Sequence, residues 1–200
     1  MYKPNYFKAY EFVPPLVYGA LKEESFSKID DRILIFMDHL RGALGRAITI
    51  NTWFFDGKFS QRGLRTEESG HYVPVTDSNR STNNHPQGKA VDFDVEGMSA
   101  KQVRDWIIKN RNLSWIKPIT FIEDDVNWVH VDVRTGDDLV LWSPKTRKAI
   151  IYSREAEDVP APVYSVEEPM ITESGNNKKK TIVVVGGLTV LLVAMYYYKR

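Results

Sequence analysis

Two short segments constrain the fold of this chain more than any other part. Residues 85–94 read His-Pro-Gln-Gly-Lys-Ala-Val-Asp-Phe-Asp, and residues 128–132 read Trp-Val-His-Val-Asp. In both segments apolar side chains alternate with histidine or aspartate, which is the period of a half-buried β-strand. The alternation predicts that the apolar side chains face the core, while Asp92 and His130 project from the opposite face. Two adjacent strands would then bring these polar side chains together.

The residue types in these segments are those that hold Zn²⁺. His85 and Asp92 are seven residues apart, and His130 follows about forty residues later. On a helix the first two would lie about 10.5 Å apart along the axis, too far for ligands that each lie about 2 Å from one ion. Gly88 and the β-rich residues after it favour a loop that enters a strand. Three protein ligands leave one coordination position open, which is typical of a catalytic rather than a structural zinc site.

Composition narrows the choice of function. Lysine and arginine number 27 and aspartate and glutamate 26, so charge gives no indication of a nucleic-acid partner, and no basic stripe appears. The chain has no cysteine, which excludes disulfides and thiolate zinc fingers. A metal ion must therefore be held by nitrogen and oxygen atoms.

The C-terminal part of the chain differs from the rest. Residues 181–198 are uncharged and apolar, with basic residues on both sides. As a helix they would span about 27 Å, close to the hydrocarbon thickness of a bilayer. Residues 154–180 are rich in proline, acids and polar residues, which is typical of an extended linker. We expect a globular domain over residues 1–153, a linker over 154–180 and a single transmembrane helix over 181–198.

Hydrophobic periodicity predicts two helices and several strands in the globular domain. The helices are expected over residues 27–44 and 100–109, with Ser27 and Asp30 near the start of the first and Gly45 at its end. The strands are expected over residues 47–53, 90–95, 120–122 and 128–133, with 139–142 as an edge strand. This order predicts an α+β fold with a small, mostly antiparallel sheet and flanking helices.

These segments resemble the zinc peptidases of the D-Ala-D-Ala carboxypeptidase and L-Ala-D-Glu endopeptidase family (LAS-type enzymes), which includes many phage endolysins. The likeness rests on His-x-x-Gly-x-Ala-x-Asp followed by Trp-x-His, supported upstream by residues 51–57 and 62–65. It covers roughly residues 6–142. The resemblance implies a zinc peptidase domain with His85, Asp92 and His130 as ligands and peptidoglycan as substrate.

The chain departs from the family pattern at two positions. Many members carry the catalytic carboxylate three residues before the last histidine, where this chain has Asn127, which cannot accept a proton from water at neutral pH. By resemblance to a subgroup that ends in Trp-x-His, Glu123 is expected to be the general base, with Asp125 the next alternative. Asn83 stands where members usually have a serine.

The resemblance also assigns residues around the substrate. The family supplies an arginine from the segment before the first ligand to stabilise the oxyanion. Arg65 matches that arginine best, and Arg62 is the alternative. Arg62, Asp125 and Trp128 are expected beside the substrate, with Trp128 packing against the site wall.

Two functions from different classes follow. The first is a membrane-anchored, zinc-dependent peptidoglycan peptidase, such as a phage virion or lysis protein. The second is a catalytically inactive structural or wall-binding virion membrane protein that keeps the fold. A metal-dependent enzyme on another amide substrate is a third reading. The expected partners are peptidoglycan, a lipid membrane of the virion or of the bacterial inner membrane, and virion structural proteins, without nucleic acid.

Overall fold

The computed structural model describes residues 1–154 as helices packed against one sheet. The helices are α1 (Pro15–Leu21), α2 (Asp31–Leu44) and α3 (Ala100–Lys109). The strands are β1 (Ile48–Thr49), β2 (Ala90–Val95), β3 (Phe121–Glu123), β4 (Val129–Asp132), β5 (Leu139–Ser143) and β6 (Lys148–Tyr152). Short 3₁₀ turns cover Ala9–Glu11, Lys22–Lys28, Trp53–Phe55 and His85–Gln87.

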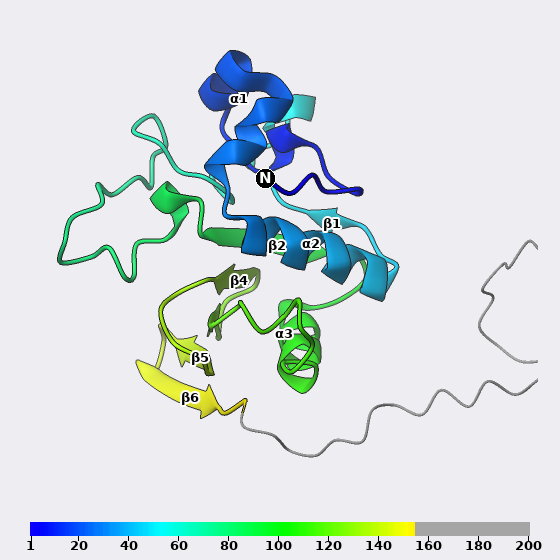
Figure 1. The fold of residues 1–200 in the computed structure, drawn as a ribbon, viewed down its shortest axis with the longest axis vertical. Coiled ribbons are helices and arrows are strands. Elements are labelled where there is room, and N and C mark those ends of the chain that lie inside the picture. The colour runs from blue at the N-terminus through cyan, green and yellow to red at the C-terminus, as the bar shows by residue number, and fades with distance from the viewer. Residues whose placement is uncertain (155–200) are drawn as a thin grey trace, which may run out of the picture. The chain divides into compact units, whose positions relative to one another are not determined.

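The strands form a mixed sheet in the order β1-β2-β4-β3-β5-β6. Within residues 1–154, the β3–β5 pair is parallel and the other four neighbouring pairs are antiparallel. Helix α2 crosses in front of β2, and α3 lies beside β4 (Figure 1). The predicted α+β class is confirmed.

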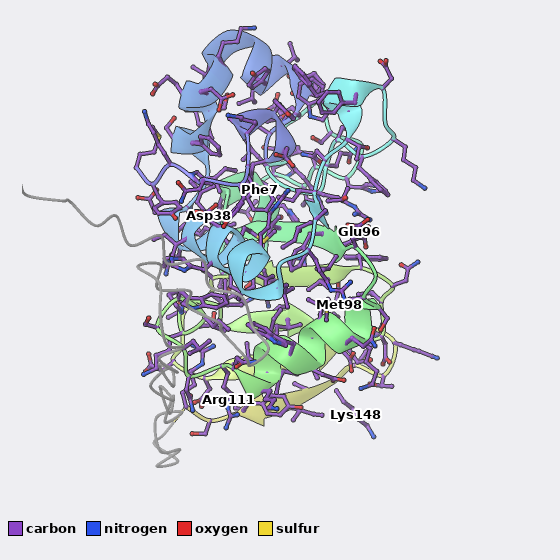
Figure 2. The ribbon with its side chains drawn as sticks, turned by 90° about the vertical axis from the view of Figure 1, so that its right-hand side faces the viewer. Phe7, Asp38, Glu96, Met98, Arg111 and Lys148 are labelled. Atoms are coloured by element: carbon purple, nitrogen blue, oxygen red, sulfur yellow. The ribbon has the colours of Figure 1, made fainter. Side chains whose placement is uncertain are left out.

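The core lies between the sheet and these two helices. Phe36 of α2 lies 6.4 Å from Phe93 of β2, measured between ring centroids, and both side chains are fully buried. The alternating apolar residues of β2 and β4 are buried as predicted. Figure 2 shows Phe7 and Asp38 where the N-terminal segment meets α2. Because the apolar side chains of β2 and β4 face the main core, the polar side chains of these strands project from the opposite face of the sheet.

Local signals explain the helix boundaries. Asp30 caps α2 by accepting a hydrogen bond from the Arg32 backbone N–H, and Gly45 ends the helix in the left-handed conformation. The helix begins at Asp31 rather than at Ser27, because residues 22–28 form a separate 3₁₀ turn. Helix α3 has the predicted bounds, with a capping box between Ser99 and Gln102.

Two strand predictions need correction, and one strand was not predicted. The strand expected over residues 47–53 is only β1, because Asn51 bonds to Glu11 and Thr52 to Phe59 instead of continuing the ladder. Strand β5 is not at the edge, since β6 pairs along its outer side. The alternation rule did not find β6, whose first four residues are all exposed.

In the part of the chain that the structure describes, no helix has both the length and the apolar character needed to cross a membrane. The transmembrane helix expected over residues 181–198 lies outside the described residues, as does the linker from residue 155 onward.

Candidate metal centre

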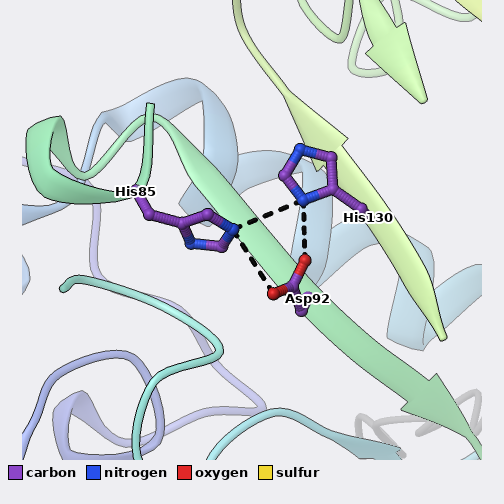
Figure 3. Close-up of side chains that lie close together, drawn as sticks. All are labelled: His85, Asp92 and His130. Carbon is purple, nitrogen blue, oxygen red and sulfur yellow. Dashed lines mark hydrogen bonds and ion pairs between the residues drawn. The ribbon is translucent and has the colours of Figure 1, made fainter. Parts of the chain in front are cut away.

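His85, Asp92 and His130 converge on one point, as the sequence predicts (Figure 3). Asp92 of β2 and His130 of β4 are direct partners in the antiparallel pairing, so both side chains leave the sheet on the same face. His85 approaches from the 3₁₀ turn that precedes β2, and Gly88 ends this turn in the left-handed conformation (φ 67°). The turn and two strands therefore assemble the group.

The spacing of the donor atoms suits a small tetrahedral ion. His85 Nε2 lies 3.3 Å from His130 Nδ1 and 3.3 Å from Asp92 Oδ2. Ligands about 2.0–2.1 Å from a tetrahedral ion are separated by about 3.3 Å, so these two distances match. His130 Nδ1 lies closer to Asp92 Oδ1, at 2.6 Å, a hydrogen bond that has to open slightly when an ion binds. Two imidazoles and one carboxylate form a donor set that fits Zn²⁺.

A backbone contact fixes the orientation of His85. Its Nδ1 lies 2.8 Å from the carbonyl oxygen of Gly63, and the histidine is 6% exposed. Donation of Nδ1–H to this carbonyl leaves Nε2 as the free donor atom facing the centre. A backbone carbonyl has no signature in the sequence, so sequence reasoning missed this contact.

His130 is oriented by a carboxylate. Its Nε2 lies 3.3 Å from Oδ2 of Asp132, while its Nδ1 faces the centre. Asp132 is fully buried and also accepts hydrogen bonds from Arg134 Nε at 2.8 and 2.9 Å. A carboxylate behind a histidine is the usual support of a metal-ligating imidazole. Asp132, paired with Arg134, is therefore placed to support the ring of His130.

The three side chains strongly affect one another's pKa values. Burial lowers the pKa of His85 despite the nearby Asp92. Burial also opposes charge on His130, but Asp92 and Asp132 outweigh it and raise the pKa of His130 to about 10. Burial would raise the pKa of Asp92, yet the two imidazoles hold it well below its ordinary value. The pKa values of the two imidazoles therefore shift in opposite directions, because burial dominates at His85 and the two neighbouring carboxylates dominate at His130.

Glu123 lies next to this group on the neighbouring strand. It pairs with His130 across β3 and β4, so Asp92, His130 and Glu123 form one row across three strands. Glu123 is half-buried, and burial raises the pKa of its carboxyl, with a further rise from Asp92 and an opposing effect from His130. A half-buried carboxyl with a raised pKa beside a candidate metal centre suits proton transfer.

The two arginines contact different carboxylates. Arg65 Nη2 donates to Asp92 Oδ2 at 3.0 Å, and Arg65 Nε donates to the Gln61 carbonyl at 2.9 Å. Arg62 Nη1 lies 2.5 Å from Asp94 Oδ2, and its guanidinium stacks over Phe59. Arg65 is thus in contact with the candidate centre, whereas Arg62 is paired beside it.

A hollow of about 270 Å³ adjoins the centre. Its lining comes from the 58–71 segment, from Asp92 and from the start of β4: Lys58, Phe59, Ser60, Gln61, Arg62, Arg65, His71, Asp92 and Trp128. The expected wall position of Trp128 agrees with this lining. His71 also lines the hollow, and its backbone N–H donates to the side-chain oxygen of Gln61.

Two other sequence-predicted positions lie apart from the row. Asp125 adopts a left-handed backbone conformation (φ 56°) and accepts a hydrogen bond from Ser143 Oγ. Asn127 lines a separate hollow of about 340 Å³ at the start of α3. The carboxylate that the structure brings into the row with His130 is therefore that of Glu123.

Comparisons with protein-family models, with curated proteins and with solved structures find no match for this chain.

Proposed function

We propose that this protein is a zinc-dependent peptidase that cleaves bacterial wall peptides containing D-amino acids. The observation that carries the proposal is the convergence of His85, Asp92 and His130 beside a hollow, with Glu123 next in the same row. The substrate class rests on the resemblance of the motifs to LAS-type peptidases.

The residues present fit a zinc ion, with His85 Nε2, His130 Nδ1 and one Asp92 oxygen as ligands. When bound, such an ion supplies a Lewis acid and lowers the pKa of a water molecule to about 7. Glu123 accepts the proton of the attacking water and delivers it to the leaving amine. The raised pKa of Glu123 supports both steps, because the carboxyl must take up a proton and then release it.

Arg65 supplies the positive charge for the developing oxyanion. It lines the hollow and is held by Gln61 and Asp92, so its guanidinium is positioned before substrate binds. Preorganised charge of this kind needs little rearrangement during the reaction, which is the basis of its catalytic effect. Arg62 and Trp128 form the substrate-binding wall beside it, and Asp125 supports the β3–β4 turn through Ser143.

The test uses the full chain with purified peptidoglycan, with product masses measured before and after metal removal by a chelator. We expect released peptides from the metal-loaded protein, none after chelation, and recovery when zinc is restored. Glu123→Gln should lower the rate by at least about 100-fold and retain zinc, since the carboxyl transfers protons without holding the ion. Glu67→Gln, at an exposed loop position, is the matched control.

The alternative is a wall-binding protein that keeps the metal without turnover. Asn127 favours it, because a carboxylate is absent at the position where many LAS-type enzymes carry one. This alternative expects no cleavage by either the unsubstituted chain or Glu123→Gln, with zinc and wall binding present in both.

We further propose that residues 181–198 anchor the protein as a single-pass helix in a virion membrane or a bacterial inner membrane. The apolar composition of this segment and its basic flanks support the proposal. The full chain should stay with membranes after alkaline extraction, whereas a chain ending at residue 180 should be released. Association with virion structural proteins would appear in cross-linking of purified particles.

A further inference from the structure

Five aromatic side chains gather beside α1 and form what we call the aromatic surface: Tyr10, Tyr18, Trp53, Phe54 and Phe55. Phe55 is 72% exposed and Phe54 44%. In Figure 1 the short cyan turn that carries Trp53–Phe55 lies next to the blue α1. Soluble proteins rarely expose several apolar side chains next to one another, so a contiguous group of exposed aromatic rings marks an interaction site.

The rings hold one another in place. Tyr10 and Phe54 stack with centroids 4.1 Å apart, and Phe55 meets Tyr10 edge-on at 5.7 Å. Trp53 donates its ring N–H to the Val13 carbonyl at 2.9 Å. A surface that is ordered before binding loses little conformational entropy when a ligand arrives.

The loop that carries three of the rings is closed by its own backbone. The N–H groups of Thr52 and Trp53 both donate to the Phe59 carbonyl, at 2.8 and 3.0 Å. Gly57 packs so closely on Thr52 that a Cβ there would lie 2.2 Å from the Thr52 hydroxyl oxygen. The loop is therefore a tight, defined structure that presents Phe54 and Phe55 at its tip.

The same loop leads directly into the hollow beside the candidate centre. Lys58 and Phe59 follow the aromatic tip and line that hollow. A polymer whose peptide branch occupies the hollow would meet the same loop that carries Phe54 and Phe55. Because the aromatic surface is continuous with the proposed active site, we expect it to bind a second part of the same substrate.

Charge around the rings favours a neutral occupant over an anionic lipid surface. Lys22 lies over the Tyr18 ring, but Glu23 accepts a hydrogen bond from the Tyr18 hydroxyl. Burial raises the pKa of Tyr10, and the nearby carboxylates of Glu11 and Glu23 raise it further. Beside the rings one lysine thus stands against two glutamates, and an anionic headgroup gains no net attraction.

We propose that the aromatic surface binds the glycan backbone of the wall polymer whose peptide enters the hollow, an inference that rests on the proposed function. Sugar rings present apolar C–H faces that lie flat on aromatic rings, and uncharged hydroxyl groups at their edges. The exposed Phe54 and Phe55 supply the faces, and the Tyr18 hydroxyl, which donates to Glu23, supplies a polar group beside them.

The test measures co-sedimentation of the full chain, in detergent, with insoluble glycan strands freed of their peptides. Phe55→Ala should weaken binding by about tenfold or more, as expected for an exposed aromatic anchor, while Phe55→Trp should retain it. Ile151→Ala, at a 66% exposed position on β6, is the matched control. Equal sedimentation of Phe55→Ala and the unsubstituted chain overturns the proposal.

Two further measurements distinguish glycan binding from lipid binding, and this inference from the proposed function. Binding to phosphatidylcholine–phosphatidylglycerol vesicles should be the same for the unsubstituted chain and Phe55→Ala, and a loss confined to vesicles would indicate a lipid surface instead. Cleavage of a soluble wall peptide without sugar should be unaffected by Phe55→Ala, while cleavage of intact walls falls. Glycan binding through Phe55 without any peptide cleavage refutes the proposed function alone, and cleavage of intact walls at equal rates refutes this inference alone.

Discussion

His130 Nε2 lies 3.3 Å from Oδ2 of Asp132, a carboxylate that is fully buried behind the candidate centre. Asp132→Asn removes the negative charge that fixes the ring orientation. We expect zinc affinity to fall by about 10- to 100-fold, measured by competition with a chelator. Asp105→Asn, on the exposed side of α3, should leave the affinity unchanged. Equal affinities for both variants would contradict the supporting role of Asp132.

The raised pKa of His130 predicts how the metal-free protein responds to pH. Its pKa is about 10 in the folded state and about 6.5 when unfolded. A raised pKa stabilises the fold fully below the unfolded value, and this contribution is lost as the pH rises through the folded value. The free energy of unfolding of the metal-free chain should therefore decline between about pH 6.5 and 10.

Chemical denaturation across this pH range, after chelation, measures the decline. His130→Gln should flatten the curve, whereas His39→Gln, at an exposed position on α2, should not. A slope that is the same in the unsubstituted chain and in His130→Gln would contradict the prediction.

Gly88 is required for the turn that carries His85. Its φ is +67°, and an added Cβ would lie 2.0 Å from the Lys28 carbonyl oxygen. Gly88→Ala should cost at least about 2 kcal/mol of unfolding free energy and displace His85, with loss of zinc. Gly19→Ala, in the middle of α1 with open space around it, should instead stabilise by up to about 1 kcal/mol. Thermal unfolding and metal content of the two variants test this contrast.

Asp38 ties the N-terminal segment to α2. It accepts hydrogen bonds from the Tyr2 hydroxyl, from the Asn5 backbone and side chain, and from the Tyr6 backbone N–H. Asp38→Ala should lower the unfolding free energy by about 2 kcal/mol, because a buried carboxylate that accepts several hydrogen bonds is lost. Asp31→Ala removes a more exposed contact to the same segment and should cost less than about 1 kcal/mol. Denaturation midpoints distinguish the two.

Sequence patterns predicted the parts of the fold that depend on local periodicity. The bounds of α3 follow from its cap and its apolar spacing, and the alternation in β2 and β4 turned Asp92 and His130 to one face. Strand β6 was missed because an exposed edge strand has no buried face to impose alternation. The extent of β1 was overestimated because Asn51 and Thr52 find backbone partners elsewhere in the chain, which periodicity does not encode.

The candidate site likewise combines residues that the sequence predicted with contacts that it did not. His85, Asp92 and His130 were predicted from residue type and spacing, and the structure places them together. Glu123 was expected as the general base by resemblance, with Asp125 the next alternative, but its place beside His130 depends on strand register, which the sequence alone does not give. His71 and the Gly63 carbonyl reach the site through loop geometry, and neither carries a pattern that a single sequence reveals.

The row from Asp92 through His130 to Glu123 forms only when β2, β4 and β3 pair in their native register. A shift of β4 by a single residue would turn His130 into the interior and put an apolar side chain in its place. A folding intermediate with β4 out of register could then not hold the ion with His85, Asp92 and His130 together. Metal capture during refolding should therefore report the moment at which β2 and β4 reach their native register, and a zinc-sensitive dye would follow that event in real time.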